Sequence, residues 1–154
     1  MRSLGKNIDS LNDILTTCKK APDITVISEF RLNDSNRVNT SLPGYRFIAE
    51  NSPTNAGGVG MYIEENTNFV RRSDIEFNID GIETYFIEIP RPKRKNIANG
   101  CIYGHPSSQL EHFHNIINDE LEYLNRSGFE TEIAGDININ FLKYATDKKH
   151  FKLS

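Results

Sequence analysis

Two amphipathic segments, with a series of short strand-like runs between and after them, restrict this chain to folds that combine helices with β-sheet. The first segment has apolar residues at steps of three and four, and we expect a helix that ends before Pro22. Its core-facing stripe consists of Leu4, Ile8, Leu11, Leu15 and Cys18. The second segment predicts a helix that ends near Gly128. Its stripe consists of Leu110, Phe113, Ile117, Leu121 and Leu124.

The remaining apolar runs are short and are separated by turn-forming residues, as expected of strands. Residues 23–29 form the first run, which is mostly apolar and ends in the carboxylate of Glu29. The runs that follow, in a pattern typical of antiparallel sheet, are residues 45–49, 58–63, 69–77, 82–89 and 97–103. A last run at residues 130–135 leads into Asp136 and Asn138. With 154 residues, 37% of them hydrophobic, the chain can form one α/β domain over residues 1–154.

The overall charge argues against a protein that holds nucleic acid by electrostatics alone, because the net charge is −3 and the sequence pI is about 5.8. Any contact with nucleic acid would therefore be local. Basic residues cluster in Arg91-Pro92-Lys93-Arg94-Lys95, with a smaller pair at Arg71-Arg72, and such a loop could follow a phosphate backbone. A solvated hairpin tip is the alternative interpretation.

The sequence has no membrane or disulfide signature. No apolar run approaches the roughly 20 residues that span a bilayer, and the first residues lead directly into the amphipathic pattern. We therefore expect a soluble intracellular protein without a membrane partner, and the nucleus is one compartment to consider. Cys18 and Cys101 both lie in apolar-patterned segments, which predicts two buried, reduced thiols.

Polar residues end three of the predicted strands, and their types suit metal-assisted phosphate chemistry: Glu29, Tyr103, and Asp136 with Asn138. Parallel or mixed sheets commonly gather such strand ends at one edge. Mg²⁺ prefers carboxylate oxygens and keeps several waters, so Glu29 is a candidate metal ligand. Asp136 could orient or deprotonate a water, Asn138 could donate to a phosphate oxygen, and Tyr103 could stabilise developing charge. Each residue type also serves turns and caps, so the structural alternative stays open.

Four sequence motifs contain or flank these residues, and their order and spacing along the chain match those of a known family. They are Pro22-Asp23-Ile24-Thr25-Val26-Ile27-Ser28-Glu29, Gly57-Gly58-Val59-Gly60-Met61-Tyr62-Ile63, Ile102-Tyr103 followed by Pro106, and Ala134-Gly135-Asp136-Ile137-Asn138. With the leader Arg2-Ser3-Leu4 and Lys6-Asn7-Ile8-Asp9, they extend to about Lys143. In this arrangement the sequence resembles the endonuclease/exonuclease/phosphatase superfamily, most of all the apurinic-type endonuclease domain of non-LTR retrotransposon, reverse transcriptase-encoding proteins. The glycines of the second motif are interpreted as sites of close sheet packing.

The resemblance implies a two-sheet α/β sandwich of the DNase I-like type that cleaves phosphodiester bonds with Mg²⁺ or Mn²⁺. It implies that Glu29 is the metal ligand, that Tyr103 and Asn138 lie at the phosphate, and that Asp136 lies at the attacking water. In retrotransposons this reaction nicks target DNA to prime reverse transcription, so DNA is the expected partner.

The sequence departs from the family pattern at both ends, so we expect a truncated domain. Complete members have an Asn upstream of the segment that matches Arg2-Ser3-Leu4, and later a second Asp and an Asp-His pair for general-base catalysis; no such block surrounds His150. Losing an oriented general base typically removes on the order of 10²–10⁴ in rate, so we expect little or no nuclease activity. Gly104-His105 also follows Tyr103 where an Arg-Pro pair is common. Two alternatives remain open: a non-catalytic remnant or binding module, and a phosphatase-type member that acts on a phosphorylated lipid or sugar.

Overall fold

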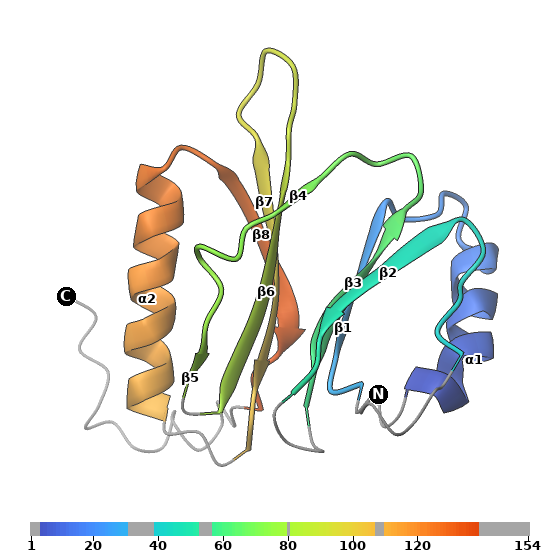
Figure 1. The fold of residues 1–154 in the computed structure, drawn as a ribbon, viewed down its shortest axis with the longest axis horizontal. Coiled ribbons are helices and arrows are strands. Elements are labelled where there is room, and N and C mark those ends of the chain that lie inside the picture. Colours follow the sequence, from blue (N-terminus) through green and yellow to red (C-terminus); the bar gives the residue numbers. More distant parts are fainter. Residues whose placement is uncertain (1–3, 31–38, 53–56, 80, 107–109, 139–154) are drawn as a thin grey trace.

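The computed structural model describes residues 4–30, 39–52, 57–79, 81–106 and 110–138. Two β-sheets lie face to face, and each carries one helix on its outer side, so four layers follow one another across the molecule (Figure 1). Helix α1 (Leu4–Thr17) covers the smaller sheet, and helix α2 (Leu110–Arg126) covers the larger one.

The smaller sheet contains three antiparallel strands. Strand β3 (Val59–Glu64) lies in the middle, between β1 (Ile24–Ser28) and β2 (Tyr45–Glu50). The register pairs Ser28 with Val59, so the end of β1 meets the start of β3. This pairing brings the backbone of Glu29 next to Gly58.

The larger sheet is mixed. Strands β6 (Ile82–Ile89) and β7 (Ile97–Gly104) form an antiparallel hairpin. Strand β8 (Glu130–Asp136) then runs parallel to β7, and α2 makes the crossover connection that parallel strands require. The short strands β4 (Val70–Arg71) and β5 (Asn78–Ile79) pair with β6.

Three apolar layers hold these elements together, because strands send alternate side chains to opposite faces. On β3, Met61 and Ile63 pack between the two sheets, whereas Tyr62 packs under α1. The layer between the sheets also contains Tyr85, Ile87, Cys101 and Tyr103. The packing beneath α2 is formed around Phe86, Ala98, Ile102 and Leu124.

Both predicted helices are present, with differences in their apolar stripes. In α1 the first four stripe residues are buried as predicted, but Cys18 lies beyond the helix end and is exposed. In α2, Leu124 is fully buried, whereas Leu121 is 42% exposed and does not belong to the packed face. The side chains of Leu110 and Phe113 lie outside the described part. Gly128 ends the helix with a φ of 79°, as predicted for a C-terminal cap.

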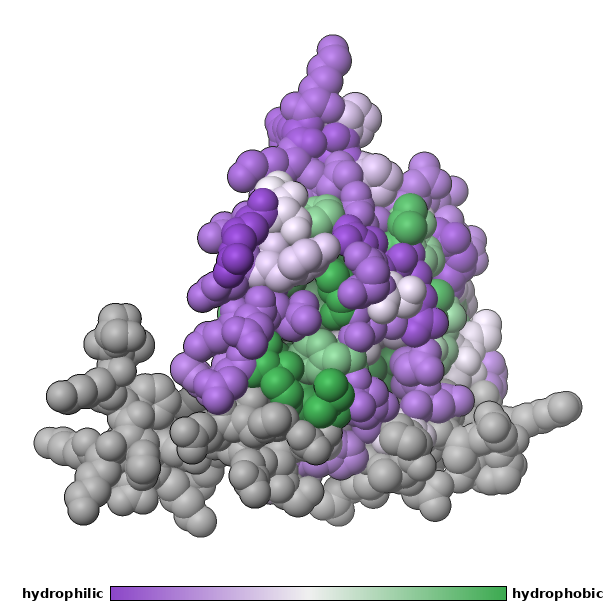
Figure 2. All heavy atoms as spheres, turned by 60° about the vertical axis from the view of Figure 1, so that its left-hand side comes forward, coloured by the Kyte–Doolittle hydropathy of each residue, from purple (hydrophilic) through white to green (hydrophobic). Residues whose placement is uncertain are grey.

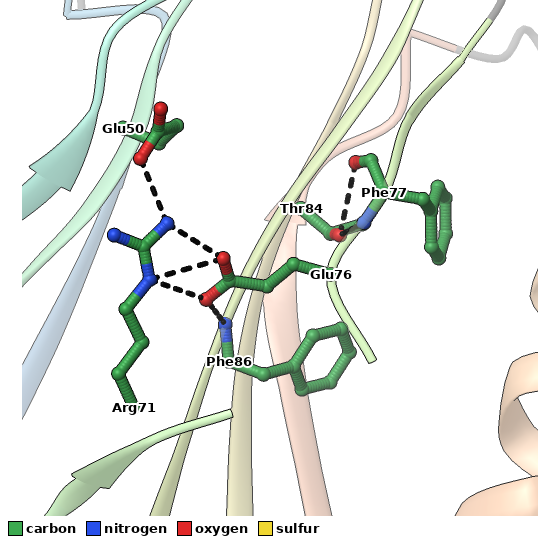
Figure 3. Close-up of polar contacts among 6 residues, drawn as sticks. All are labelled: Glu50, Arg71, Glu76, Phe77, Thr84 and Phe86. Carbon is green, nitrogen blue, oxygen red and sulfur yellow. Dashed lines mark hydrogen bonds and ion pairs between the residues drawn. The ribbon is translucent and has the colours of Figure 1, made fainter. Parts of the chain in front are cut away.

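The predicted strand over residues 69–77 is wrong, because only its start pairs with β6 as β4. A turn that begins at Arg72 interrupts it. Beyond the turn, the amide of Thr84 donates to the carbonyl oxygen of Phe77 at 3.1 Å, and side chains add further hydrogen bonds to the backbone (Figure 3). The carboxylate of Glu76 accepts the amide of Phe86 at 3.1 Å, and the hydroxyl of Thr84 bonds both the amide and the carbonyl of Phe77.

The basic residues singled out in the sequence are either paired with acids or distant from the predicted site residues. Arg71 donates to Glu50 at 2.8 Å and to Glu76 at 2.7 Å, and the hydrogen bond to Glu76 raises the pKa of Arg71 (Figure 3). Residues 91–95 form the tip of the β6–β7 hairpin, and their contact with a phosphate backbone stays a prediction (Figure 1). Since each strand residue adds about 3.3 Å, the length of β7 puts this tip about 25 Å from Tyr103.

The surface that carries α2 is mainly hydrophilic, with small hydrophobic groups, as Figure 2 shows with this side turned forward. Leu121 and Tyr123 of α2 contribute exposed apolar side chains to the surface. Among the described residues, no helix is both long and apolar enough to cross a lipid bilayer.

The two cysteines differ in exposure, which corrects the prediction of two buried thiols: Cys18 is exposed and Cys101 is buried, and both are free. Burial raises the pKa of the Cys101 thiol to about 12, and the thiolate is the reactive form. We therefore expect iodoacetamide at about pH 8 to modify Cys18 in the folded protein and Cys101 only after unfolding. Mass spectrometry with and without urea checks this, and rapid double modification of the folded chain would contradict it.

Candidate active site

The carboxyl ends of β1, β7 and β8 lie toward one edge of the two sheets, opposite the hairpin tip (Figure 1). Strands β7 and β8 reach this edge together because their parallel register pairs Tyr103 with Asp136. Strand β1 reaches it from the other sheet, and the Cys101 thiol of β7 donates to the Ile27 carbonyl at 3.4 Å. The two sheets therefore bring the strand ends that carry the predicted site residues to a common edge.

Glu29 directly follows β1 and lies in the left-handed region, with a φ of 54°. Its amide donates to the carbonyl oxygen of Gly58 at 2.9 Å, which joins the end of β1 to the start of β3. A residue with a β-carbon is disfavoured by roughly 1 kcal/mol or more in this conformation. The chain thus leaves β1 through a turn at the position of this half-buried carboxylate.

Asp136 and Asn138 form a turn at the end of β8. The exposed Asp136 accepts the amide of Asn138 on Oδ1 at 3.0 Å, and Asn138 has a φ of 50°. The side-chain amide of Asn138 donates to the carbonyl oxygen of Gly104 at 2.9 Å, which ties the turn to the end of β7. Asp and Asn commonly adopt such turns, so these residues serve the turn. Asp136 has a second carboxylate oxygen and Asn138 a second amide hydrogen, the groups that a reaction would use.

Gly135 permits the close approach of β8 to β7. It has a φ of 154°, and a β-carbon there would stand 1.8 Å from the carbonyl oxygen of Ile102. No residue with a side chain fits this distance without movement of the backbone. The glycine next to Asp136 is therefore required by the same strand pairing that sets Asp136 opposite Tyr103.

Tyr103 is the least accessible of the four predicted residues, with 2% of its surface exposed. Its ring contacts the imidazole of His105 edge-on, with the ring centroids 4.8 Å apart. Contact between the phenol and a phosphate therefore requires the phosphate to approach this edge closely.

Two residues at this edge, Glu83 and His105, were not identified as functional from the sequence. Glu83 is only 3% exposed, and its carboxylate accepts hydrogen bonds from Ser52, from the amide of Gly58 and from Nε2 of His105. The sequence feature that could have identified Glu83 is its position as the single carboxylate in the mostly apolar run at residues 82–87. Glutamate is rarely buried without partners, so such a position predicts a polar network.

The glycines at the start of β3 are sites of close packing, as predicted. A β-carbon on Gly57 would lie 2.6 Å from Oε1 of Glu83, and one on Gly58 would lie 2.6 Å from the ring of Phe30. Both glycines also have positive φ values, 144° and 97°. The turn into β3 therefore passes directly over the Glu83 carboxylate.

The donor chemistry of this edge is compatible with a divalent cation. Within the described residues, no three His, Cys, Asp or Glu side chains are grouped closely enough to hold a metal ion by themselves. Mg²⁺ and Mn²⁺ accept one or two protein carboxylates when water and substrate complete the shell, and Glu29 and Asp136 provide carboxylates here. A cavity of about 190 Å³, lined in part by Arg71, Glu76 and Glu83, includes none of the four predicted residues.

No protein-family model and no curated protein sequence matches this chain. Among solved structures, the chain is similar to the endonuclease domain of TRAS1, a telomere-specific non-LTR retrotransposon, with a TM-score of 0.56 and 11% sequence identity. The similarity covers 91% of this chain and 55% of the other, so this chain spans about half the length of that structure. At this identity the similarity shows the fold alone. It confirms the predicted two-sheet α/β fold of the DNase I-like type and, at the level of fold, the resemblance to retrotransposon endonuclease domains.

Proposed function

We propose that this chain carries the site of a metal-dependent DNA endonuclease, formed by Glu29, Tyr103, Asp136 and Asn138. The observation that carries the proposal is the common edge, where Tyr103 pairs with Asp136 in register and Asn138 bonds the end of β7. A fold does not by itself define a substrate. The choice of DNA is supported by the sequence motifs together with the structural similarity to an endonuclease domain.

Phosphodiester hydrolysis requires a water oxygen to bond to phosphorus while one P–O ester bond breaks and the leaving oxygen gains a proton. The exposed carboxylate of Asp136 would accept a hydrogen bond from this water and orient it. Asn138, held at Gly104 through one amide hydrogen, would donate the other to a phosphate oxygen. The phenol of Tyr103 would stabilise negative charge at the phosphate.

Glu29 would bind the divalent cation, which neutralises charge on the phosphate when it is bound. The resemblance assigns the general base to an Asp-His pair, and this pair does not occur among the 154 residues. An oriented general base typically contributes on the order of 10²–10⁴ in rate. For these 154 residues we therefore expect cation binding, with slow nicking or none.

The first test is a Mn²⁺ titration in which electron paramagnetic resonance detects the free ion. We expect Glu29→Gln to weaken Mn²⁺ binding about tenfold or more, equivalent to about 1.4 kcal/mol. Asp23→Asn removes an exposed carboxylate just before β1 and is the matched control. Equal affinities of Glu29→Gln and the unsubstituted chain would contradict the proposal.

The second readout is the conversion of supercoiled plasmid to the nicked form with Mg²⁺. Any conversion should disappear with EDTA and fall about tenfold or more in Asp136→Asn, which weakens the acceptor for the attacking water. Glu132→Gln changes an exposed carboxylate on the same strand and should retain the activity of the unsubstituted chain. Nicking that survives EDTA would contradict a metal-dependent reaction.

The burial of Tyr103 and the bonded amide of Asn138 favour a second candidate, a non-catalytic binding module. In such a module the strand-end residues maintain only the turn geometry. Glu29→Ala and Asp136→Ala would then change local stability and leave Mn²⁺ affinity and plasmid nicking unchanged. The Mn²⁺ titration and the plasmid assay above therefore separate the candidates.

A further inference from the structure

Glu83 joins both sheets at the candidate site through one buried carboxylate. Its Oε1 accepts the Ser52 hydroxyl at 2.5 Å and Nε2 of His105 at 2.8 Å, and its Oε2 accepts the Gly58 amide at 2.7 Å. Ser52 follows β2, Gly58 precedes β3, and His105 follows β7. A single side chain on β6 thus contacts three segments that meet at this edge.

A carboxylate in this position needs an explanation, because burying it is unfavourable unless hydrogen-bond donors compensate. The next residues on the same face of β6, Tyr85 and Ile87, pack in the apolar layer between the sheets. An apolar side chain at position 83 could continue this layer without the desolvation cost. Packing alone therefore does not account for Glu83, whereas the three donors that it holds do.

Glu83 is connected to Glu29 through the backbone of Gly58. The amide of Gly58 donates to Glu83, and the carbonyl of Gly58 accepts the amide of Glu29 at 2.9 Å. The absence of a side chain at Gly57 lets this turn lie against the carboxylate. Movement of the Glu83 side chain would therefore release the backbone that fixes Glu29 in its left-handed conformation.

Through His105, Glu83 is also connected to Tyr103 and to the end of β7. The hydrogen bond between Nε2 of His105 and Oε1 of Glu83, at 2.8 Å, holds the orientation of the imidazole ring. This ring packs edge-on against Tyr103, and the preceding residue, Gly104, accepts the amide of Asn138. Glu83 thereby restrains the end of β7 as well as the turn into β3.

We propose that Glu83 is a positioning residue, which holds the Glu29 turn and the His105–Tyr103 ring pair in fixed relative positions. The inference rests on the proposed function only for the role of Glu29 as the cation ligand. Glu83 and His105 touch neither cation nor substrate in this proposal, and each acts through a neighbouring residue.

The test compares Glu83→Gln with Glu88→Gln in the full chain. Glu88 lies on the same strand, accepts Arg72 at 2.7 Å and Asn96 at 2.5 Å, and is remote from the site edge. Thermal unfolding, hydrogen exchange of the Glu29 amide and Mn²⁺ affinity are measured for both variants. We expect similar losses of thermal stability, but faster Glu29 exchange and about tenfold weaker Mn²⁺ binding only in Glu83→Gln, as for other residues that support a metal ligand.

A double-mutant cycle distinguishes positioning from general destabilisation. If Glu83 acts through Glu29, Glu83→Gln should cause no further loss of Mn²⁺ affinity in a Glu29→Gln background. His105→Phe, which keeps a ring against Tyr103 but lacks Nε2, should speed exchange of the backbone amide at position 105 and leave the Glu29 amide protected. This variant replaces Glu83→Gln if the latter does not fold, and unchanged exchange of the position-105 amide would then overturn the proposal.

Three results would overturn the inference: unchanged exchange at Glu29 in Glu83→Gln, additive losses of Mn²⁺ affinity in the cycle, or the same changes in Glu88→Gln. Failure of the proposed function is recognised separately, because the unsubstituted chain would then bind no Mn²⁺. In that case the exchange comparison alone decides: faster Glu29 exchange confined to Glu83→Gln supports positioning of the turn, and equal exchange overturns it.

Discussion

Gly135→Ala is expected to lower the free energy of unfolding by about 4 kcal/mol, with roughly half from backbone strain and half from overpacking. The added β-carbon would stand 1.8 Å from the carbonyl oxygen of Ile102, so β7 and β8 must separate or shift. The φ of 154° adds strain, because residues with side chains rarely adopt it. Since the register sets Asp136 opposite Tyr103, the same shift would displace the candidate site.

Gly128→Ala is the matched control for this substitution. Gly128 also has a positive φ, 79°, but a β-carbon there would meet no atom within 4 Å. Gly128→Ala should therefore lower the free energy of unfolding by about 1 kcal/mol, from backbone strain alone. Urea unfolding followed by far-ultraviolet circular dichroism measures both values. Similar midpoints for the two variants would show that β8 tolerates a side chain at position 135, contrary to the geometry.

Leu124→Ala is expected to lower the free energy of unfolding by about 3 kcal/mol, in the range found for large-to-small changes in cores. Leu124 is fully buried and belongs to the packed layer that attaches α2 to the larger sheet. Truncation removes apolar contact and leaves a cavity beside the other buried residues of this layer, Ile75, Phe86 and Ala98. The α2 helix is also the crossover between β7 and β8, so its loosening should weaken their pairing.

Leu121→Ala provides the comparison on the same helix. Leu121 is 42% exposed, and alanine is the better helix former, so we expect a change within about 0.5 kcal/mol. Thermal and urea unfolding of the two variants test the difference. If Leu121→Ala and Leu124→Ala lowered the free energy of unfolding equally, Leu121 would contribute to the packing of α2 as much as Leu124 does, which contradicts its observed exposure.

The architecture was predictable because apolar periodicity reports which side chains are buried. The stripe from Leu4 to Leu15 and the run at residues 82–89 both gave elements close to those observed. Glu29, Asp136 and Asn138 were predictable as strand-end residues, since each lies at the end of a predicted strand. Their common edge follows from sheet topology, which the order of the elements already restricts.

Features that depend on contacts between distant segments were not predictable. Residues 69–77 look like a strand, but Glu76 and Thr84 satisfy the neighbouring backbone with their side chains (Figure 3). Cys18 continues the apolar stripe in sequence, yet the helix ends one residue before it. Glu83 and His105 are 22 positions apart in the sequence, so no local pattern could reveal that they share a hydrogen bond.

The left-handed backbone at Glu29 makes this position informative about selection in an evolving population. Glycine would relieve roughly 1 kcal/mol of strain there, so mutational drift under selection for a stable fold alone should replace this glutamate. Asn138 has a similar φ, but asparagine tolerates that region well and is under little such pressure. In a library evolved for thermal stability without selection for activity, Glu29 should therefore be lost before Asn138. Its persistence in a lineage would be a record that the carboxylate itself was needed.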